Sequence, residues 1–358
     1  MKVCILGDGL SSLTLAKSLV NQNIYVDLLS QKKGLRLNQS RTLGISRSNV
    51  DFFNKNIINI EKLLWKLKKI EIFTDNLTKE KLLNFENNND QLFSTIKNHE
   101  LYKVLEADLI KNKFFKKKLF DNKDTSFIDN YDLIINCNYF HTITKKYFSK
   151  NIIKKYNSFA YTTIIKHEKI LNKTAVQIFT KKGPLAFLPI SSKETSVVYS
   201  VNDSNKKKEN IEELIKLYNF KYKITKIKKI DSVELKSLNL RSYQHNNILA
   251  FGDLLHKIHP LAGQGFNMTI RDIKILIKII SKKCELGLQL DSSVINEFEN
   301  TMRHKNLIFS SSVDLIYEFF NIERKIKSNI LSKSVQFIGK NPSINKMLTS
   351  IADKGILF

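Results

Sequence analysis

The sequence predicts an α/β fold, in which a Rossmann-like nucleotide-binding domain carries an inserted, mostly antiparallel β domain and a helical C-terminal region. Three observations predict it. A short apolar run at residues 2–6 ends in a glycine-rich turn before a helical pattern, four apolar runs lie close together between residues 159 and 200, and the residues from 298 onward keep helical spacing. Strand, glycine turn, helix and strand within about thirty residues form the βαβ unit that opens a doubly wound sheet.

The remaining elements follow in an order that divides the chain into four segments. Residues 54–98 indicate a helix followed by short strands, and the runs between 159 and 200 predict an antiparallel sheet because turn signals separate them. Helical spacing returns at residues 211–218, and residues 248–251 indicate a strand before a long helix. We expect the first part of the nucleotide-binding domain at residues 1–150 and the β-rich domain at residues 151–242. The nucleotide-binding domain then returns at residues 243–300, and a helical cap follows at residues 301–358.

The composition excludes a disordered chain and gives little support to a nucleic-acid binder. The 358 residues are 42% hydrophobic and contain 59 Lys+Arg against 34 Asp+Glu, a net charge of +25. Only seven of the basic residues are Arg, the side chain on which base reading usually depends. We favour a compositional origin of the charge over a selected polyanion-binding surface, and nucleic acid is not an expected partner.

The cysteines and the apolar segments indicate a cytoplasmic protein. Cys4, Cys137 and Cys284 are isolated from one another, so neither a disulfide framework nor a zinc site is expected. His256 and His259 have no third ligand beside them, and we expect no metal. No apolar segment reaches the roughly 18 residues that span a bilayer, so the protein is expected to be free or peripheral to the inner face of the membrane.

The N-terminal turn has two glycines of a dinucleotide-binding fingerprint. Gly7 and Gly9 occupy the first two glycine positions of GxGxxG, and Ser12 occupies the third. The first glycine makes the turn, the second admits a pyrophosphate, and the third allows close packing of helix on strand. Ser30 stands where an acidic residue usually binds a ribose, and its hydroxyl can make a weaker bond. A dinucleotide is therefore favoured over a chance glycine turn.

A second motif lies at residues 252–267 and carries the strongest chemical signal. Asp253 ends a strand, Pro260 makes a turn, and Gly263 and Gly265 expose backbone N–H groups at the start of a helix. Amides at such a helix start form a positive pole that stabilises negative charge on a ligand. Cofactor contact by Asp253 is favoured over a purely structural role as a cap.

Residues 252–267 resemble the GDAAHxxHPxxGQGxN signature of the flavin-dependent aromatic monooxygenases. Within that group the chain is most similar to the polyprenylphenol hydroxylases of ubiquinone biosynthesis. Further landmarks occur in the order of that family, namely Ser40-Arg41-Thr42-Leu43, Leu64-Trp65, Ile70-Glu71-Ile72, residues 175–180, residues 183–189, Arg303 and Val313-Asp314. The resemblance extends over nearly the whole chain.

The resemblance implies an enzyme that binds FAD and hydroxylates the aromatic ring of a polyprenylated phenol through a flavin C4a-hydroperoxide. It implies O2 as co-substrate and NAD(P)H or a redox protein as reductant. The residues expected at FAD are Gly7, Gly9, Ser12, Ser30, Arg41, Asp253, Gly263, Gln264, Gly265 and Asn267, with Pro260, Gly263, Gln264 and Gly265 around the flavin ring. Leu185, Phe187 and Pro189 are expected in the substrate pocket, and no side chain is nominated as a nucleophile.

The chain also departs from the family pattern near the cofactor. Asn138 and Tyr139 replace an Asp-Gly pair that the family links to its dinucleotides, and Leu254 and Leu255 replace two alanines. These changes predict that electrons come from a redox protein instead of directly from NAD(P)H. They also leave an alternative, a degenerate flavoprotein that is a non-catalytic component of a quinone-biosynthesis complex. Other proteins of that pathway and the membrane surface are the expected partners besides the substrate.

Overall fold

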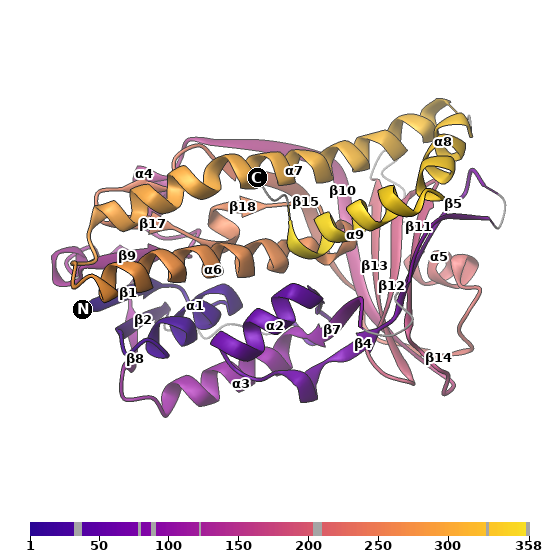
Figure 1. Cartoon of the computed structure of the whole chain (residues 1–358). Coiled ribbons are helices and arrows are strands. Elements are labelled where there is room, and N and C mark those ends of the chain that lie inside the picture. The colour runs from indigo at the N-terminus through magenta and orange to yellow at the C-terminus, as the bar shows by residue number, and fades with distance from the viewer. Residues whose placement is uncertain are drawn as a thin grey trace.

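The computed structural model describes residues 1–31, 38–77, 80–86, 91–121, 123–202, 210–326 and 329–355. Two sheets form the framework, with a small third sheet between them (Figure 1). The predicted α/β class, with a Rossmann-like domain, a mostly antiparallel β domain and C-terminal helices, is confirmed.

The first sheet is parallel except at one edge. Its order is β16-β17-β9-β1-β2-β8, and only β16 runs antiparallel to its neighbour. The strands are β1 (Lys2–Leu6), β2 (Tyr25–Gln31), β8 (Phe115–Phe120), β9 (Leu133–Asn136), β16 (Gln244–His245) and β17 (Ile248–Ala250). The chain passes from β1 outward to β2 on one side, whereas β9 joins β1 on the other side. Ligands of such doubly wound sheets bind at the carboxyl ends of the strands at this switch point.

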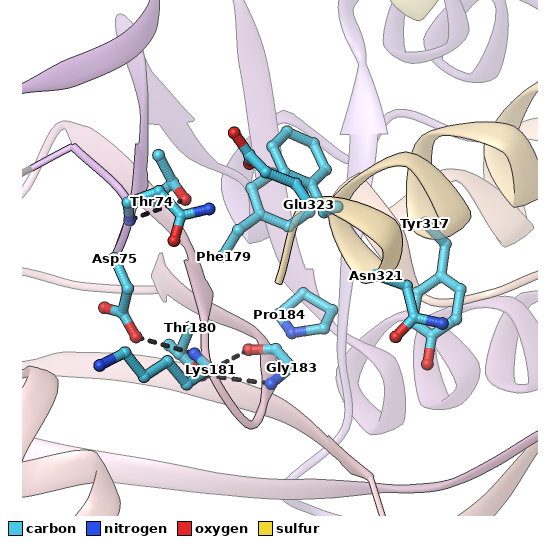
Figure 2. A pocket seen from close by; sticks show the side chains of 12 residues that line it. Thr74, Asp75, Phe179, Thr180, Lys181, Gly183, Pro184, Tyr317, Asn321 and Glu323 are labelled. Carbon is cyan, nitrogen blue, oxygen red and sulfur yellow. Dashed lines mark hydrogen bonds between the residues drawn. The ribbon is translucent and has the colours of Figure 1, made fainter. Parts of the chain in front are cut away.

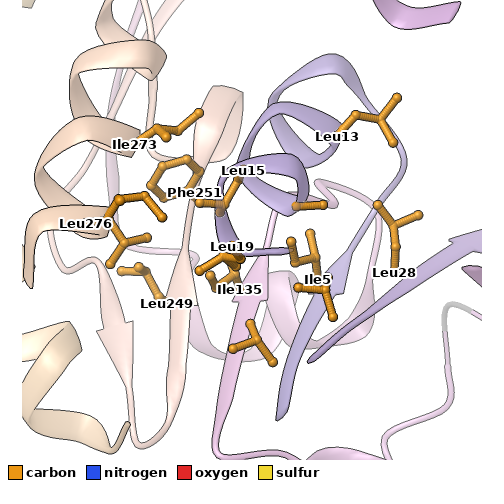
Figure 3. Packing of buried hydrophobic residues seen from close by; sticks show 14 of the residues in the cluster. Ile5, Leu13, Leu15, Leu19, Leu28, Ile135, Leu249, Phe251, Ile273 and Leu276 are labelled. Atoms are coloured by element: carbon orange, nitrogen blue, oxygen red, sulfur yellow. The ribbon is translucent and has the colours of Figure 1, made fainter. Parts of the chain in front are cut away.

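Two of the described helices that pack in the core of the parallel sheet begin beside its strand ends. These are α1 (Leu10–Val20) and α6 (Gln264–Glu285), whose leucines and isoleucines pack on the strands (Figure 3). Ile5, Leu15 and Leu276 are fully buried in this cluster. The helical spacing of the apolar residues therefore places α1 and α6 on the sheet, and both helices begin at the edge where the parallel strands end.

The second sheet is large and mostly antiparallel. Its order is β18-β15-β10-β13-β12-β11-β5-β6, with β14 also paired to β10 and with β11 and β5 parallel. The strands are β5 (Lys69–Thr74), β6 (Lys81–Glu86), β10 (Asn151–His167), β11 (Thr174–Thr180), β12 (Gly183–Pro189), β13 (Glu194–Asn202), β14 (Ile224–Ile227), β15 (Asp231–Leu240) and β18 (His256–Lys257). β5 and β6 thus belong to this sheet, although the sequence assigned residues 1–150 to the nucleotide-binding domain.

The small sheet and the remaining helices connect these layers. The small sheet pairs β3 (Thr42–Ser46) and β4 (Trp65–Leu67) with β7 (Phe93–Lys97). The remaining helices are α2 (Arg47–Asn56), α3 (Asn98–Ile110), α4 (Thr142–Tyr147), α5 (Ile211–Tyr218), α7 (Ser292–Ile326), α8 (Ile330–Gly339) and α9 (Pro342–Lys354), and short 3-10 turns lie at Glu61–Leu63, Ile128–Asn130, Gly252–Leu254 and Leu261–Gly263.

The C-terminal helices lie along both main layers. α7 has 35 residues, which corresponds to a length of ~50 Å, and it crosses the predicted boundary at residue 300. α8 and α9 fold back beneath it over the large sheet (Figure 1). Within the described part of the chain, no helix combines the length and apolar character needed to cross a membrane.

The two faces of the large sheet have different partners, because side chains alternate along each strand. One face packs under α5, where Leu185 and Phe187 join Ile211 and Ile215 in a buried cluster. The opposite, inner face is turned toward the small sheet, α6 and α7. This division decides which residues of the large sheet can face a cofactor or substrate.

Candidate cofactor site

The glycine turn after β1 lies at the switch point of the parallel sheet. Gly7 has φ +100°, a conformation that side chains disfavour, and its N–H donates to the carbonyl oxygen of Leu29 at 2.8 Å. A Cβ atom on Gly7 would lie 3.5 Å from the backbone nitrogen of Asn138. The turns after β1 and β9 are therefore in contact, and the Asn138-Tyr139 departure lies directly at the turn.

Gly9 leaves open space at the start of α1. It is the N-cap residue with an ordinary φ of −71°, and no described atom lies within 4 Å of the position of a Cβ on it. No described side chain caps the helix, and the first turn has no acidic residue. The N–H groups of this first turn are thus free to bind an anion such as a pyrophosphate.

One acidic side chain lies inside this turn. Asp8 is half-buried between the two glycines, and burial raises the pKa of its carboxyl while Lys117 opposes the increase. A phosphate bound at Gly9 would add a further negative charge nearby. The sequence reasoning did not single out Asp8.

The second motif returns the chain to the same edge of the sheet. A Cβ on Gly252, which has φ +65°, would lie 3.0 Å from the Cβ of Ser11 in α1. Asp253 follows as an exposed side chain, and its charge acts on the buried thiol of Cys137 after β9. Burial raises the pKa of that thiol to about 12, which keeps it protonated. Asp253 therefore lies at the carboxyl ends of the strands, and its contact with a cofactor stays a prediction.

The turn before α6 contacts β3. Gly263 is the N-cap residue of α6 with φ +64°, and a Cβ on it would lie 3.5 Å from the backbone of Gly44. No described atom lies within 4 Å of the corresponding position on Gly265. The start of α6 thus has open space beside uncapped amides, and Pro260 precedes it in a half-buried turn.

Asn267 holds this turn in place from inside the molecule. Its side chain is fully buried, and Oδ1 accepts hydrogen bonds from the backbone N–H of Ser46 and from Asn49, both at 2.9 Å. Its Nδ2 donates to the carbonyl oxygens of Gly44 and Gly263 at 3.1 and 3.3 Å. Asn267 was predicted to contact the cofactor. In the structure its side-chain hydrogen bonds go to the protein and hold β3 against α6.

Gln264 is bonded to the end of the chain. Its Nε2 donates to the carbonyl oxygen of Ala352 at 3.3 Å, and its Oε1 accepts from Arg271 at 3.0 Å. Arg271 also lies against Gly355, where a Cβ would be 2.9 Å from Nη1. The last turn of α9 is thus part of the wall around the start of α6, a contact that the sequence reasoning missed.

The other predicted FAD residues differ in exposure. Ser12 is fully buried in α1, and its side chain interacts with the thiol of Cys137 after β9. Ser30 is 1% exposed within β2, and Arg41 is exposed before β3. Ser12 therefore supports close packing of α1, whereas contacts of Ser30 and Arg41 with a nucleotide stay predictions.

These features fit an extended dinucleotide. There is open space at Gly9 and Gly265, and each lies at the N-terminus of a helix that no described side chain caps. The free amides of such a terminus suit a pyrophosphate or the electron-rich edge of a ring. FAD is thus compatible with the residues present.

Phe93 forms an additional part of the wall. Its ring covers Gly44 so closely that a Cβ there would overlap the ring, and it lies 3.9 Å from the position of a Cβ on Gly263. Phe93 also packs with Leu67 and Ala175, and Leu188 of β12 joins the same cluster. The aromatic residue between the α6 turn and the large sheet is therefore Phe93, which local sequence patterns do not indicate.

The prediction that Leu185 and Phe187 line the substrate pocket is wrong. Both side chains lie in the core beneath α5, on the outer face of the large sheet. Alternation along β12 turns Ala186 and Leu188 toward the inner face instead. Pro189 lies at the end of β12, where its carbonyl oxygen accepts a hydrogen bond from Thr95 of the small sheet.

A row of half-buried residues crosses the inner face of the large sheet. Thr162, Val198, Ala186, Gln177 and Ile72 are register partners on five neighbouring strands. The row is mostly apolar and begins beside Ser40, whose Oγ lies 3.4 Å from the Oγ1 of Thr162. It is a better candidate for contact with an aromatic substrate than the outer face.

A separate small cavity lies where the turn between β11 and β12 faces the end of α7 (Figure 2). Its volume is about 20 Å³, and its walls include Thr180, Pro184, Tyr317 and Glu323. This volume holds about one water molecule. The cavity is therefore too small for an aromatic ring and is not a substrate site.

The two histidines of the motif are buried and separate. His256 lies 2.5 Å from Asp272, measured from Nε2 to Oδ2, whereas neither ring nitrogen of His259 has a hydrogen-bond partner in the described structure. His259 packs between Tyr156 and Tyr317, and its burial lowers its pKa to about 3. Among the described residues no group of three His, Cys, Asp or Glu side chains could hold a metal.

Comparison with known proteins gives these features a family context. Residues 138–285 match the model of the FAD binding domain family. The chain is 22% identical to a mitochondrial ubiquinone biosynthesis monooxygenase of Danio rerio, over 51% of this chain and 46% of that protein. It is 28% identical to the 3-demethoxyubiquinol 3-hydroxylase of Escherichia coli, over 40% of this chain and 39% of that protein. Over these parts of its length the chain is similar to proteins named as ubiquinone-biosynthesis hydroxylases.

Its relation to these hydroxylases covers part of their length, and solved structures extend the likeness of the fold. The chain spans less than half the length of either curated relative. The chain is similar in structure to a p-nitrophenol 4-monooxygenase from Pseudomonas putida, with a TM-score of 0.76 and 12% identity. The match covers 97% of this chain and 96% of that protein. HpxO of Klebsiella pneumoniae, solved with FAD and uric acid, has a TM-score of 0.75 at 11% identity, over 99% of this chain and 97% of that one. These likenesses show the fold of the FAD-dependent monooxygenases.

Proposed function

We propose that the chain is an FAD-dependent monooxygenase that hydroxylates the aromatic ring of a polyprenylated phenol in ubiquinone biosynthesis. The observation that carries the proposal is the meeting of both glycine motifs at the switch point of the parallel sheet, with open space at Gly9 and Gly265. The matched FAD binding domain and the named hydroxylase relatives support it.

The chain's own groups have three tasks in this proposal. Amides in the first turn of α1 bind the pyrophosphate, Asp253 binds the ribityl or phosphate region, and amides at the start of α6 face the flavin ring. FAD, when bound, supplies the redox chemistry that activates O2 for transfer to the ring. The inner face of the large sheet, including Ala186 and Leu188, orients the phenol and excludes water from the reacting atoms.

We also propose that the reducing electrons come from a redox protein. The observation behind this is the position of Asn138 against Gly7, followed by the exposed rings of Tyr139 and Phe140 at 44% and 71% exposure. Asn138 and Tyr139 stand where the family has Asp-Gly. Flavin bleaching by a redox protein and its reductase under anaerobic conditions, without bleaching by NADPH alone, is expected. Rapid bleaching by NADPH alone contradicts this part of the proposal.

Reconstitution and complementation together test the function. Purified protein is expected to turn yellow with FAD, and its gene is expected to restore hydroxylation in hydroxylase-deficient cells, whereas Asp253→Ala is not. Mass spectrometry of the intermediate that accumulates when the gene is deleted identifies the substrate. A protein that stays colourless with FAD contradicts the proposal. Restoration by wild type but not by Asp253→Ala excludes the alternative of a non-catalytic flavoprotein, which the hydroxylase relatives do not favour.

A further inference from the structure

Helix α8 has an inner side that packs on the protein and an outer side that is apolar. On the inner side, Gln336 Nε2 donates to the carbonyl oxygen of Lys81 at 2.9 Å, and Gly339 lies against Leu83 without space for a side chain. On the outer side, Ile330 is 68% exposed and Phe337 is 80% exposed. Val335 of α8 packs inward on the core, so α8 has apolar side chains on its outer side as well as on its inner side.

The outer side forms one continuous surface. Its residues follow one another at helical spacing. We call this surface the α8 outer face, and it consists of Ile330, Lys333, Ser334, Phe337 and Ile338. Adjacent exposed apolar side chains of this kind mark interaction sites, in contrast to single exposed residues.

The orientation of α8 is fixed by a buried carboxylate. Glu323 of α7 is 1% exposed, and its two oxygens accept hydrogen bonds from the N–H and the Oγ of Ser332, both at 2.6 Å. Ser332 is itself fully buried. These bonds tie α8 to the end of α7, and α8 lies at the end of the molecule near β5 (Figure 1).

Charge identifies the kind of partner. The sequence from residue 324 to 352 contains six basic and no acidic residues. Lys333 lies on the outer face itself, and Lys340 and Lys346 are exposed after it. The acidic contacts of α8 lie on its inner side: the buried Glu323, and Glu80, which accepts a hydrogen bond from Gln336. Aliphatic and aromatic side chains with lysines between them match the boundary of headgroups and acyl chains in an anionic bilayer.

We propose that the α8 outer face binds the surface of an anionic lipid bilayer. Ile330, Phe337 and Ile338 enter the boundary between headgroups and acyl chains, while Lys333 and Lys340 bind lipid phosphates. This binding needs no flavin chemistry. Only its use, the collection of a prenylated phenol dissolved in the membrane, rests on the proposed function.

Vesicle flotation of the full chain tests the proposal without any activity measurement. The wild type is expected to bind phosphatidylcholine vesicles that contain phosphatidylglycerol more strongly than phosphatidylcholine alone. The double variant Phe337→Ser, Ile338→Ser is expected to lose about tenfold or more in partitioning. The matched control is Leu217→Ser, Phe220→Ser, which removes side chains that are 73% and 63% exposed near α5 and is expected to bind as the wild type. Equal binding by both double variants overturns the proposal.

Two further measurements separate a lipid partner from a protein partner. Lys333→Glu is expected to weaken binding only to the vesicles with phosphatidylglycerol, and the emission of Phe337→Trp is expected to shift to the blue on those vesicles, unlike that of Leu217→Trp. A wild-type dimer that becomes a monomer in the Phe337→Ser, Ile338→Ser variant, without lipid, shows that a second copy covers the face and overturns the proposal. An absent blue shift overturns it as well.

Discussion

The Oδ1 atom of Asp353 accepts a hydrogen bond from the backbone N–H of Ser48 at 2.8 Å, so the end of α9 caps the first turn of α2. Ser46, the N-cap residue of α2, makes no side-chain cap and donates instead to the carbonyl oxygen of Asp353 at 2.8 Å. α9 has no buried residue, and these bonds join its last turn to β3. The strand that contacts the α6 turn is therefore tied to the end of the chain.

Replacement of the capping carboxylate is expected to destabilise the protein. Asp353→Ala leaves the N–H of Ser48 without its acceptor, and the loss of a helix cap costs about 1 kcal/mol in the free energy of unfolding. Urea denaturation measures the change. Asp353→Asn keeps an oxygen acceptor and is expected to lose less. Equal losses in the two variants contradict a capping role.

The two glycines of the N-terminal turn are expected to differ in what they control. Gly7→Ala forces a side chain into φ +100° and is expected to lower the free energy of unfolding by about 1 to 3 kcal/mol. Gly9→Asp places a favourable N-cap residue in open space, so the stability of the apoprotein is expected to stay within about 0.5 kcal/mol of wild type or to rise. The new carboxylate repels a pyrophosphate, so FAD affinity is expected to fall by more than about tenfold.

Thermal unfolding of the apoproteins and flavin fluorescence titration separate these two effects. Gly9→Asn is the neutral control for Gly9→Asp, because it fills the same space without the charge. Undiminished FAD affinity in both Gly9 variants excludes the α1 start as the pyrophosphate site.

Local patterns sufficed for several elements and for the glycine positions, although α2 ends at Asn56 and the helix predicted at the start of residues 54–98 is absent from the described part of that segment. β1 and α5 occupy the predicted residues 2–6 and 211–218, because each is a short apolar pattern that ends at a polar or glycine signal. Gly7 and Gly263 were identified by their spacing in the two motifs, and both have positive φ values, which glycine adopts without strain. Turns that need a positive φ value can thus be predicted from the presence of glycine.

Roles that depend on distant contacts could not be read in this way. The alternation along β12 has two possible phases, and only the packing of α5 shows that Leu185 and Phe187 lie outside the inner face. Gln264 bonds to Ala352, 88 positions away, and Asn267 bonds to Ser46, 221 positions away. No local spacing encodes such pairs, so both residues were assigned to the cofactor without their structural partners.

The buried pair of His256 and Asp272 is expected to stabilise the joint between α6, α7 and β18. Asp272 is fully buried, and its Oδ1 accepts a hydrogen bond from Asn306 at 2.9 Å in addition to the contact with His256. Asp272→Ala leaves both partners unpaired and is expected to cost about 3 kcal/mol of unfolding free energy. Chemical denaturation, with the exposed Asp51→Ala as control, checks this. A loss no larger than that of the control refutes it.

Acid is expected to destabilise the protein through His259. Burial lowers its pKa to about 3 in the folded protein, against about 6.5 in the unfolded chain, so between these values only the unfolded state binds the proton. This contribution is complete above pH ~6.5 and decreases by up to about 1.4 kcal/mol for each pH unit below it. His259→Phe removes it, so the free energy of unfolding of wild type relative to this variant is expected to drop by about 2 kcal/mol between pH 7 and 5. Urea denaturation at both pH values measures the difference, with His304→Gln on the exposed side of α7 as control. A pH-independent difference between wild type and His259→Phe shows that His259 is not held neutral by burial.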